Sequence, residues 1–477
     1  MRIAVIGAGI VGSLISRELS KYDLELHLIE KNPDVGWGTT KANSAIIHAG
    51  YDDPPGTMRA RFCVLGNELY GELSRELDFD FRRIGSHVVA FTEEEMEILE
   101  DLMDRGMKNG VQNLRILDRE ELLSMEPNLN PSVKASLWAP SAGITEPWEV
   151  AISAVENAME NGLNLHLNER VLEISVERGK VRRVKTNKGE YDVDIVINCA
   201  GVHADDIAKM AGAEPFDILP RKGEYILLDE DAHVVNSIIF PTPTKKSKGI
   251  LILPTIDGGT LLGPTAEDLP KSKKDDLETT KDGIERIKRA CLKLVPSLNF
   301  SRVLKTFAGM RAETKKMDFI IGKTKVWGFI NVAGMRSPGL TAAPAIAKYV
   351  VEKIIQEDLG VGLERKKNFK PFRKRIPHIE NYGLEEWEEV VKKDPRFGKM
   401  VCFCNKVSEG EIVEAIKRGA RTLDGVKFRT KAGFGKCQGG FCTLRILEIM
   451  SRELGIPIEE IKLNNDEASM MNGKVRE

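Results

Sequence analysis

The pattern of apolar residues at the start of the chain predicts a complete βαβ unit. In "RIAVIGAGIVGSLISRELSKYDLELHLIEK" a β-branched run is followed by helical apolar spacing and then by the apolar strand pattern of residues 24–30. Gly7, Gly9 and Gly12 stand between the first strand and the helix, where they allow a tight turn, close approach of a pyrophosphate and close packing of helix on strand. Glu30 ends the second strand, where a carboxylate can bind a ribose diol. We therefore predict a dinucleotide cradle.

Three further segments favour a flavin over a nicotinamide as the bound ring. Residues 36–63 are rich in small and hydroxyl side chains, which suit a loop lying flat against a ring system. Residues 191–201 predict a buried strand that ends in a small-residue turn, and residues 327–350 predict a strand, a glycine loop and a helix starting near Thr341. A helix N-terminus stabilises negative charge on a reduced flavin. The sequence has no second GxGxxG unit of this kind for NAD, so the electrons need another exit.

Length and charge limit the kinds of partner. A chain of 477 residues exceeds what one hydrophobic core supports, so two or three domains are expected. Its 70 basic and 72 acidic residues nearly cancel, which predicts no general affinity for nucleic acid or anionic membranes. The sequence shows no leader and no long apolar run, so we expect a cytoplasmic protein without a membrane span. Its partners should be small molecules or proteins.

The seven cysteines fall into two groups. Cys63, Cys199 and Cys291 lie in apolar surroundings and are expected to be buried free thiols. The other four lie near the chain's end, and their first pair, CxC, is closer than zinc sites usually have. Four thiolates can instead hold an iron–sulfur cluster, with glycine N–H groups donating to the sulfurs. Structural zinc and disulfides are the alternatives. These four residues are Cys402, Cys404, Cys437 and Cys442.

The cradle and the two glycine-rich segments together resemble the D-amino-acid oxidase and glycerol-3-phosphate dehydrogenase superfamily of flavoproteins. The likeness covers about residues 1–355 and implies one bound FAD. It implies that the adenosine and pyrophosphate side is held by Gly7, Gly9, Gly12 and Glu30. It implies that the flavin is lined by Thr40, Asn43, Ser44 and Ala45 and covered by Gly334, Gly339, Leu340 and Thr341. Lys31, Val171, Ala200 and Gly201 are further cofactor-binding candidates.

The late cysteines resemble those of a second family. About residues 400–460, including "CQGGFC", look like the small [2Fe-2S] domain of bacterioferritin-associated ferredoxin, which also ends the large subunits of anaerobic glycerol-3-phosphate dehydrogenases. The resemblance implies that the four cysteines hold a [2Fe-2S] cluster. Such a cluster would be the electron exit to a partner flavoprotein or another electron-acceptor subunit.

Five residues are candidates for substrate chemistry. His48 in "AIIHAGY" directly follows the flavin-lining segment and could take a hydroxyl proton as base, or could only bond the flavin or backbone. Arg311 and Arg336 could anchor a phosphate or carboxylate, or form structural ion pairs. Lys222 and Tyr225 could face the site from a strand, or belong to an ordinary sheet face. The family resemblance supports His48 and Arg311.

The substrate is expected to be a small anion. The resemblance implies oxidation of sn-glycerol 3-phosphate to dihydroxyacetone phosphate. The stretches "KGEY" and "SPGLT", however, look more like L-2-hydroxyglutarate dehydrogenases, so an L-2-hydroxy acid is the first alternative. A subunit of an amino-acid or hydroxyproline dehydrogenase complex is the second. A chain with a vestigial pocket, serving only electron transfer or assembly, is a further class.

We expect an α/β fold with a discontinuous Rossmann-like FAD domain. Its segments would be about 1–85, 145–215 and 305–355, and a mixed-sheet substrate domain would take 86–144 and 216–304. A linker (356–399), a small helical cluster domain (400–460) and a loose tail (461–477) would follow. The basic stretch 363–377 is either a solvated linker or a docking surface for an acidic partner, and Ser408 and Glu411 predict a helix capping box.

Overall fold

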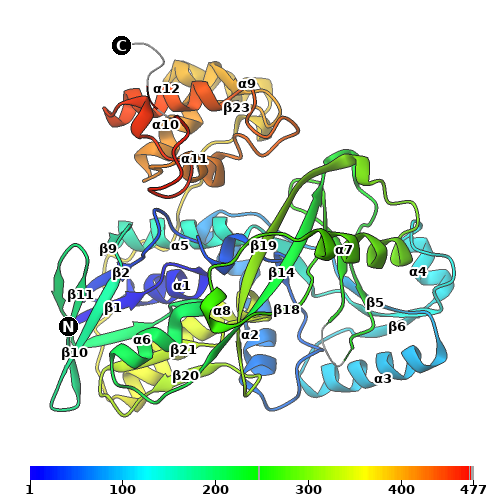
Figure 1. Ribbon diagram of the computed structural model, residues 1–477, viewed down its shortest axis with the longest axis horizontal. Helices are drawn as coiled ribbons and strands as arrows, with labels where there is room; N and C mark the ends of the chain where they lie inside the picture. The colour runs from blue at the N-terminus through cyan, green and yellow to red at the C-terminus, as the bar shows by residue number, and fades with distance from the viewer. Residues whose placement is uncertain (245–247, 472, 474–477) are drawn as a thin grey trace. The chain divides into compact units, whose positions relative to one another are not determined.

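The computed structural model describes residues 1–244, 248–471 and 473 (Figure 1). The chain forms two compact units. The first comprises Met1–Ile29 and Gly36–Arg373, and the second comprises Glu30–Val35 and Lys374–Glu477. Each is described by itself below.

A six-stranded sheet forms one layer of the first unit. Its order is β20-β21-β13-β1-β2-β9, and every pairing is parallel except that of β20 with β21. Near-continuous runs of buried β-branched residues explain why these strands lie in the interior. Helix α1 (Ile10–Leu19) packs against α5 (Pro147–Glu160) and α8 (Gly339–Tyr349) beside the sheet (Figure 1). The strands are β1 (Arg2–Ile6), β2 (Glu25–Ile29), β9 (Leu163–His166), β13 (Ile195–Asn198), β20 (Ile320–Lys323) and β21 (Phe329–Ala333).

A nine-stranded mixed sheet forms the other large layer of this unit. Its order is β18-β14-β17-β16-β15-β5-β7-β6, and β19 also pairs with β14. Strands β14 and β19 form a long antiparallel ribbon with Arg221 opposite Arg311 (Figure 1). The strands are β5 (Ser86–Ala90), β6 (Arg115–Asp118), β7 (Ala135–Ala139), β14 (Ile218–Leu228), β15 (Ile238–Pro241), β16 (Leu251–Pro254), β17 (Thr260–Gly263), β18 (Glu267–Asp268) and β19 (Val303–Thr314).

The strands can be compared with the segments expected from the sequence. All six strands of the parallel layer come from the ranges expected for the FAD domain. Strand β19 was expected there too, but it pairs along its length with β14 of the other layer. The expected α/β class is confirmed.

Two small sheets and several helices complete the first unit. One sheet joins β10 (Val171–Glu177), β11 (Lys180–Thr186) and β12 (Glu190–Asp192), and the other joins β3, β8 and β4. The members of the second sheet are β3 (Ile46–Ile47), β8 (Gly143–Thr145) and β4 (Phe81–Arg83). The remaining helices are α2 (Met58–Leu77), α3 (Glu93–Lys108), α4 (Arg119–Met125), α6 (Ala204–Met210) and α7 (Lys281–Leu294).

The basic stretch that ends the first unit pairs with acids of the same unit. The guanidinium of Arg373 lies 2.7 Å from the carboxylate of Glu156, and the Lys370 ammonium lies 3.0 Å from Glu160. Both acids belong to α5. Arg373 is therefore packed against α5, whereas Lys370 stays largely exposed, and two charges of the stretch are already paired.

The second unit is a small helical domain, as expected. A hairpin of β22 (Met400–Cys402) and β23 (Val407–Ser408) leads into α10 (Glu409–Lys417), α11 (Leu423–Thr430) and α12 (Thr443–Leu454). The predicted capping box is confirmed, because the Ser408 hydroxyl accepts a hydrogen bond from the Glu411 N–H and the Glu411 carboxylate accepts one from the Ser408 N–H.

Two expectations for the second unit are wrong. The presumed linker contains the helix α9 (Leu384–Lys393), whose apolar stripe the sequence reading overlooked. The start of the tail is not loose, because Ile461 is buried and the N–H groups of Leu423 and Asp424 bond to the carbonyls of Lys462 and Leu463. Residues 472 and 474–477 of the expected tail lie outside the described residues.

The three scattered cysteines are buried free thiols, as predicted. Cys63, Cys199 and Cys291 are all buried, and burial raises the pKa of each thiol. No helix within the described ranges combines the length and apolarity needed to cross a membrane.

Candidate active site

Two of the three glycines of the first turn, Gly7 and Gly12, are required by close backbone contacts. A Cβ atom at Gly7 would lie 2.5 Å from the Cys199 carbonyl oxygen, and one at Gly12 would lie 1.9 Å from the Gly7 carbonyl oxygen. At Gly9, the N-cap of α1, a Cβ would meet only the Thr40 hydroxyl, at 3.3 Å. The turn is thus closed by packing on two sides and open at Gly9, which fits the approach of a pyrophosphate to the helix N-terminus.

The segment after β2 is held in shape by its own polar groups. The Asn43 side chain donates to the carbonyls of Thr39 and Thr40 and accepts from the Ala45 N–H at 2.7 Å. Ala45 has a left-handed backbone, with φ 59°. The Ser44 hydroxyl lies 3.5 Å from the Tyr225 hydroxyl. This loop has the rigid, small-residue surface that a flavin ring needs.

The second glycine-rich segment lies next to His48, which follows the first loop. Gly334, with φ 74°, turns the chain out of β21, and α8 then begins at Gly339. The Thr341 hydroxyl accepts from the His48 N–H at 2.9 Å, and the Leu340 carbonyl accepts from the Tyr70 hydroxyl at 2.7 Å. The start of α8 is therefore fixed against the residues that follow the first loop.

The remaining residues expected at the cofactor lie at strand ends. Ala200 and Gly201 follow β13, and a Cβ at Gly201 would meet no atom within 4 Å. Val171 starts β10 and is buried in the first unit. Glu30 and Lys31 directly follow β2 but belong to the second unit, where the Glu30 carboxylate accepts from the Asn32 N–H at 2.9 Å. The binding roles of these residues stay predictions.

His48 is held by three separate parts of the first unit. It directly follows β3, and its carbonyl accepts from the Asn67 amide at 2.9 Å. Its ring Nε2 lies 3.0 Å from the Ser337 hydroxyl of the glycine-rich segment before α8. The ring centroid lies 6.1 Å from that of Phe240 in β15. A hydroxyl group thus already stands within hydrogen-bond distance of the ring nitrogen that would act as base.

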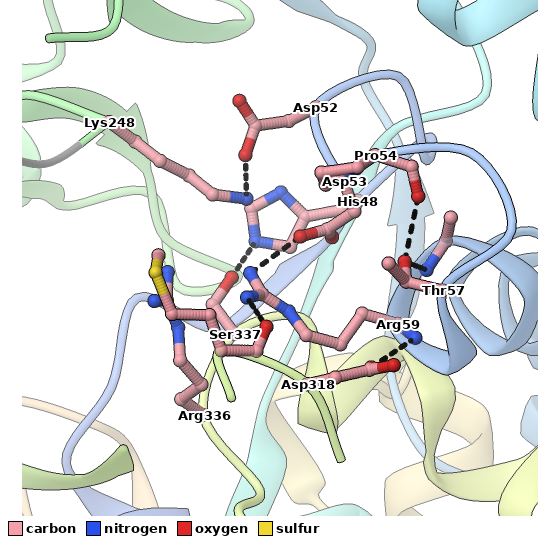
Figure 2. A network of polar contacts seen from close by, with 12 residues as sticks. His48, Asp52, Asp53, Pro54, Thr57, Arg59, Lys248, Asp318, Arg336 and Ser337 are labelled. Carbon is pink, nitrogen blue, oxygen red and sulfur yellow. Dashed lines mark hydrogen bonds and ion pairs between the residues drawn. The ribbon is translucent and has the colours of Figure 1, made fainter. Parts of the chain in front are cut away.

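Two ion pairs flank this histidine (Figure 2). The Lys248 ammonium lies 2.8 Å from the Asp52 carboxylate, and the buried Arg59 guanidinium lies 2.5 Å from Asp53. Arg59 also donates to the Met317 carbonyl at 2.7 Å. Within each pair the positive and negative charges offset one another. The histidine is therefore surrounded by charges of both signs.

A pocket opens beside His48. Its lining includes His48, Asp52, Cys63, Phe240 and Lys248. Small-molecule sites typically combine mostly apolar walls with a few polar groups. The lining of this pocket has that character, because it places charged and apolar side chains together beside the histidine.

The surroundings of His48 favour its neutral form. Burial lowers the pKa of His48 well below its ordinary value, and the Lys248 ammonium lowers it further; Asp52 opposes the shift, and Arg59 adds to it. A neutral imidazole can accept a proton at neutral pH. The geometry and the charge environment thus both suit a general base.

Arg311 is a partly buried cation with no ion-pair partner among its contacts in the described residues. Its guanidinium donates to the backbone carbonyls of Arg221, Lys222 and Thr265, at distances from 2.5 to 3.3 Å. Burial lowers its pKa, as do the nearby Arg336 and Arg221, whereas Tyr225 and Glu313 raise it. A partly buried cation held by carbonyls favours an anionic ligand.

Arg336 is already paired. One of its guanidinium nitrogens bonds the Glu313 carboxylate at the end of β19, whereas its Nε has no partner among the described residues. Burial lowers its pKa, as does the nearby Arg59, while Glu313 raises it. The positive charge of Arg336 is therefore largely compensated by the Glu313 carboxylate. This makes Arg336 a weaker candidate than Arg311 for binding an anionic substrate.

Lys222 and Tyr225 lie on opposite faces of β14. Residues three apart in a strand point to opposite sides. The Lys222 ammonium donates to the Glu278 carbonyl at 2.8 Å, while Tyr225 stacks on Phe307 at 4.8 Å between ring centroids, on the face of Arg311. The structure thus brings Tyr225 toward the loop of Ser44 and does not bring Lys222 there.

Sequence reasoning missed the residues of the two ion pairs. Asp52 and Asp53 follow His48 so closely that "HAGYDDPP" could have drawn attention to them. Arg59 lies one turn further, at the start of α2. Lys248 stands in a lysine-rich stretch, and no local signal sets it apart from a solvated loop.

The four late cysteines stand as two pairs in the second unit. The Sγ atoms of Cys404 and Cys437 are 3.7 Å apart, and the Cys442 thiol bonds the sulfur of Cys402. Two thiolates on one tetrahedral metal with bonds of about 2.3 Å would lie about 3.8 Å apart. No group of three candidate metal ligands is found within the described ranges.

The sulfurs receive backbone donors, as the glycine-rich sequence predicts. The N–H groups of Gly433, Asn405 and Cys404 point to Cys402, and the Cys442 thiol together with these donors lowers the pKa of Cys402 to about 6. A Cβ at Gly435 would lie 2.4 Å from the Cys404 Cβ. The donor set and the close packing fit a four-thiolate cluster.

Comparisons with known proteins agree with both halves of this description. Residues 2–353 match the family model "FAD dependent oxidoreductase", and residues 400–452 match "BFD-like [2Fe-2S] binding domain". The chain is 46% identical over 478 aligned residues to glycerol 3-phosphate dehydrogenase of Caloramator mitchellensis, covering 99% of this chain and 98% of the relative.

Two other similarities cover the first unit. Human mitochondrial L-2-hydroxyglutarate dehydrogenase is 26% identical over 74% of this chain and 88% of its own. The solved structure of Mycoplasma pneumoniae L-alpha-glycerophosphate oxidase, with FAD bound, has a TM-score of 0.73 and 33% identity, over 78% of this chain and 98% of its own. The chain therefore belongs to the FAD-dependent oxidoreductase family defined by the matched model, and it carries a C-terminal [2Fe-2S]-binding domain.

Proposed function

We propose that this chain oxidises sn-glycerol 3-phosphate to dihydroxyacetone phosphate. The observation that carries the proposal is the match along 99% of the chain to a glycerol 3-phosphate dehydrogenase, which includes both cofactor regions. The pocket beside His48 and the unpaired charge of Arg311 support it, because the substrate has one reacting hydroxyl and one strongly anionic end.

His48 would take the proton of the substrate's secondary hydroxyl. Its lowered pKa favours the neutral ring, which can accept a proton, and the Ser337 hydroxyl at 3.0 Å marks the position from which a substrate hydroxyl would approach Nε2. Arg311 would bind the phosphate. Tyr225, on the same face of the ribbon, would form the wall of the site beside the phosphate. Bound FAD would accept the hydride from the carbinol carbon.

The route of the electrons after this step is part of the proposal. The cysteine pairs would hold a [2Fe-2S] cluster, which accepts one electron at a time. The cluster would pass the electrons to a partner subunit or carrier protein.

An anaerobic reduction assay tests the substrate. Glycerol 3-phosphate, L-2-hydroxyglutarate and L-proline are each added to the purified holoprotein, and bleaching of the flavin absorbance is followed. Rapid bleaching by glycerol 3-phosphate alone is expected. Bleaching only by the hydroxy acid would replace the proposed substrate, and no bleaching by any of them would support a vestigial pocket.

A further inference from the structure

The thiols at the end of the chain have an exposed side and a buried side. Cys404 is exposed and Cys437 is partly exposed, whereas Cys402 and Cys442 are buried. An electron leaving a cluster held by these residues would reach the surface of the second unit by the shortest path at Cys404 and Cys437.

Two aromatic side chains next to these cysteines in the sequence are exposed to solvent. Phe403, between Cys402 and Cys404, is 68% exposed, and Phe441, next to Cys442, is 83% exposed. The Phe441 N–H bonds the sulfur of Cys437, so this residue is held directly on the site. Exposed aromatic residues in one place are characteristic of protein interfaces, where they often provide much of the binding energy.

The charged residues within the two segments that carry these rings are all basic. Lys406, Lys436 and Arg445 are exposed, and neither residues 400–408 nor residues 431–447 contain an aspartate or glutamate. Acids lie at the edge of this area: Glu380 lies 3.1 Å from the Lys406 ammonium, and the exposed Glu448 follows Arg445 by one turn of α12. We give the name cluster face to six exposed residues of the two segments: Phe403, Cys404, Lys406, Lys436, Phe441 and Arg445.

We propose that the cluster face is the docking surface for an acidic one-electron carrier protein. This rests on the proposed function, which supplies the electrons. The basic rim would attract an acidic partner and orient it, and the two phenylalanines would pack against it. A protein is favoured over a phospholipid surface because the face surrounds the ligands of a one-electron centre, and phospholipids cannot accept electrons from it.

The electrons balance with two carrier molecules per turnover. Oxidation of the secondary alcohol breaks its C–H and O–H bonds, forms the C=O bond and releases two electrons and two protons. Each carrier takes one electron, so two dock in succession, and the protons pass to solvent.

The test compares two haem proteins of opposite charge as electron acceptors. The acidic soluble haem domain of a b-type cytochrome and the basic cytochrome c are each mixed with the holoenzyme and glycerol 3-phosphate, and haem reduction is followed. We expect at least about tenfold faster reduction of the acidic protein at low salt, because complementary charges steer association. The difference should vanish at high salt.

Variants locate the surface. The double variant Lys436→Glu with Arg445→Glu should lower kcat/KM for the acidic haem protein about tenfold and raise it for cytochrome c. Phe441→Ala should raise KM for the acidic protein by a similar factor. Lys393→Glu, an exposed charge reversal on α9, is the matched control and should change neither.

Direct binding gives a readout independent of turnover. Calorimetric titration of the oxidised holoenzyme with the acidic haem domain should show salt-dependent binding that the double variant weakens. Equal rates with both haem proteins, or variants without effect on rates and binding, would overturn the proposal. Binding of the cluster face to anionic lipid vesicles in place of the haem domain would overturn it in favour of a membrane surface.

Two controls separate this proposal from its premises. Flavin bleaching by glycerol 3-phosphate must be unchanged in every variant, and a wild-type protein that fails to bleach refutes the proposed function instead. Cluster reduction by substrate without any carrier must also be unchanged. If the variants slow that internal step, the face serves transfer within the chain and the docking proposal fails.

Discussion

At the scale of single residues, His48 carries the largest share of the proposed chemistry. We expect His48→Gln to lower kcat about 10²- to 10⁴-fold, the usual contribution of a general base, while FAD stays bound. Stopped-flow bleaching of the flavin by glycerol 3-phosphate measures this directly. His233→Gln, at an exposed position, is the matched control. A His48 variant that bleaches at the wild-type rate would exclude the base.

The lowered pKa of His48 has a consequence for pH dependence. The base is active when unprotonated, and burial and Lys248 keep its pKa below the ordinary value of about 6.5. The acid limb of kcat/KM should therefore lie well below pH 6.5, and activity should be level from there to neutrality. Lys248→Met should move that limb to higher pH. A wild-type limb centred at or above pH 6.5 would contradict this environment.

Arg311 differs from Arg221 and Arg336 in that its hydrogen bonds within the described part of the chain go to carbonyls and not to a carboxylate. Arg311→Ala should weaken the transition-state interaction by about 2 to 5 kcal/mol, the cost of removing one partner of a buried charge pair, and should raise KM. Arg221→Ala is the control, since Arg221 lies opposite in the ribbon but is paired with Asp268. An unchanged KM for Arg311→Ala would remove Arg311 from the site.

At the scale of elements, the βαβ turn is the most sensitive part of the cofactor cradle. Gly12→Ala would place a Cβ 1.9 Å from the Gly7 carbonyl oxygen, so α1 must shift and FAD binding should be lost or much weakened. The control is Gly71→Ala within α2, where a Cβ meets no atom within 4 Å, so this variant should bind FAD normally. Flavin content after purification and FAD titration of the apoprotein measure both. Full flavin occupancy in Gly12→Ala would contradict the packing argument.

The elements could be predicted where the local pattern was strong. The βαβ unit, the strand ending before Ala200 and the capping box at Ser408 all follow from short-range spacing. The strand period could also have corrected one expectation, because Lys222 and Tyr225 are three residues apart and cannot face the same side. The pairing of β19 with β14 could not be predicted, since nothing local tells a strand which sheet it will join.

The ion pairs of the site show the same limit for side chains. Lys248 and Asp52 are nearly two hundred positions apart, and only the fold brings the ammonium within 2.8 Å of the carboxylate. Arg311 and Arg336 look alike in sequence, yet β19 places Glu313 against only one of them. The sequence therefore predicted which residue types the site needs, and the fold decides which of them remain available to a ligand.

At the scale of the whole molecule, the two cofactor regions are expected to bind their cofactors independently. The FAD family match covers residues 2–353, and the [2Fe-2S] match covers residues 400–452. Cys437→Ser should remove one ligand of the proposed exposed iron and lower iron and sulfide content, while flavin content and substrate bleaching stay at wild-type levels. Cys291→Ser, a buried free thiol of the first unit, is the control and should retain both cofactors. Loss of flavin in Cys437→Ser would contradict the independence of the two sites.

The central claim is that electrons from the substrate reach a metal centre in the same chain. Low-temperature electron paramagnetic resonance of the anaerobic holoprotein, frozen after addition of glycerol 3-phosphate without any acceptor, tests it most directly. The account predicts the spectrum of a reduced [2Fe-2S] cluster, present in the wild type and absent in Cys437→Ser. A bleached flavin with no cluster signal, in protein shown to contain iron and sulfide that dithionite can reduce, would contradict it.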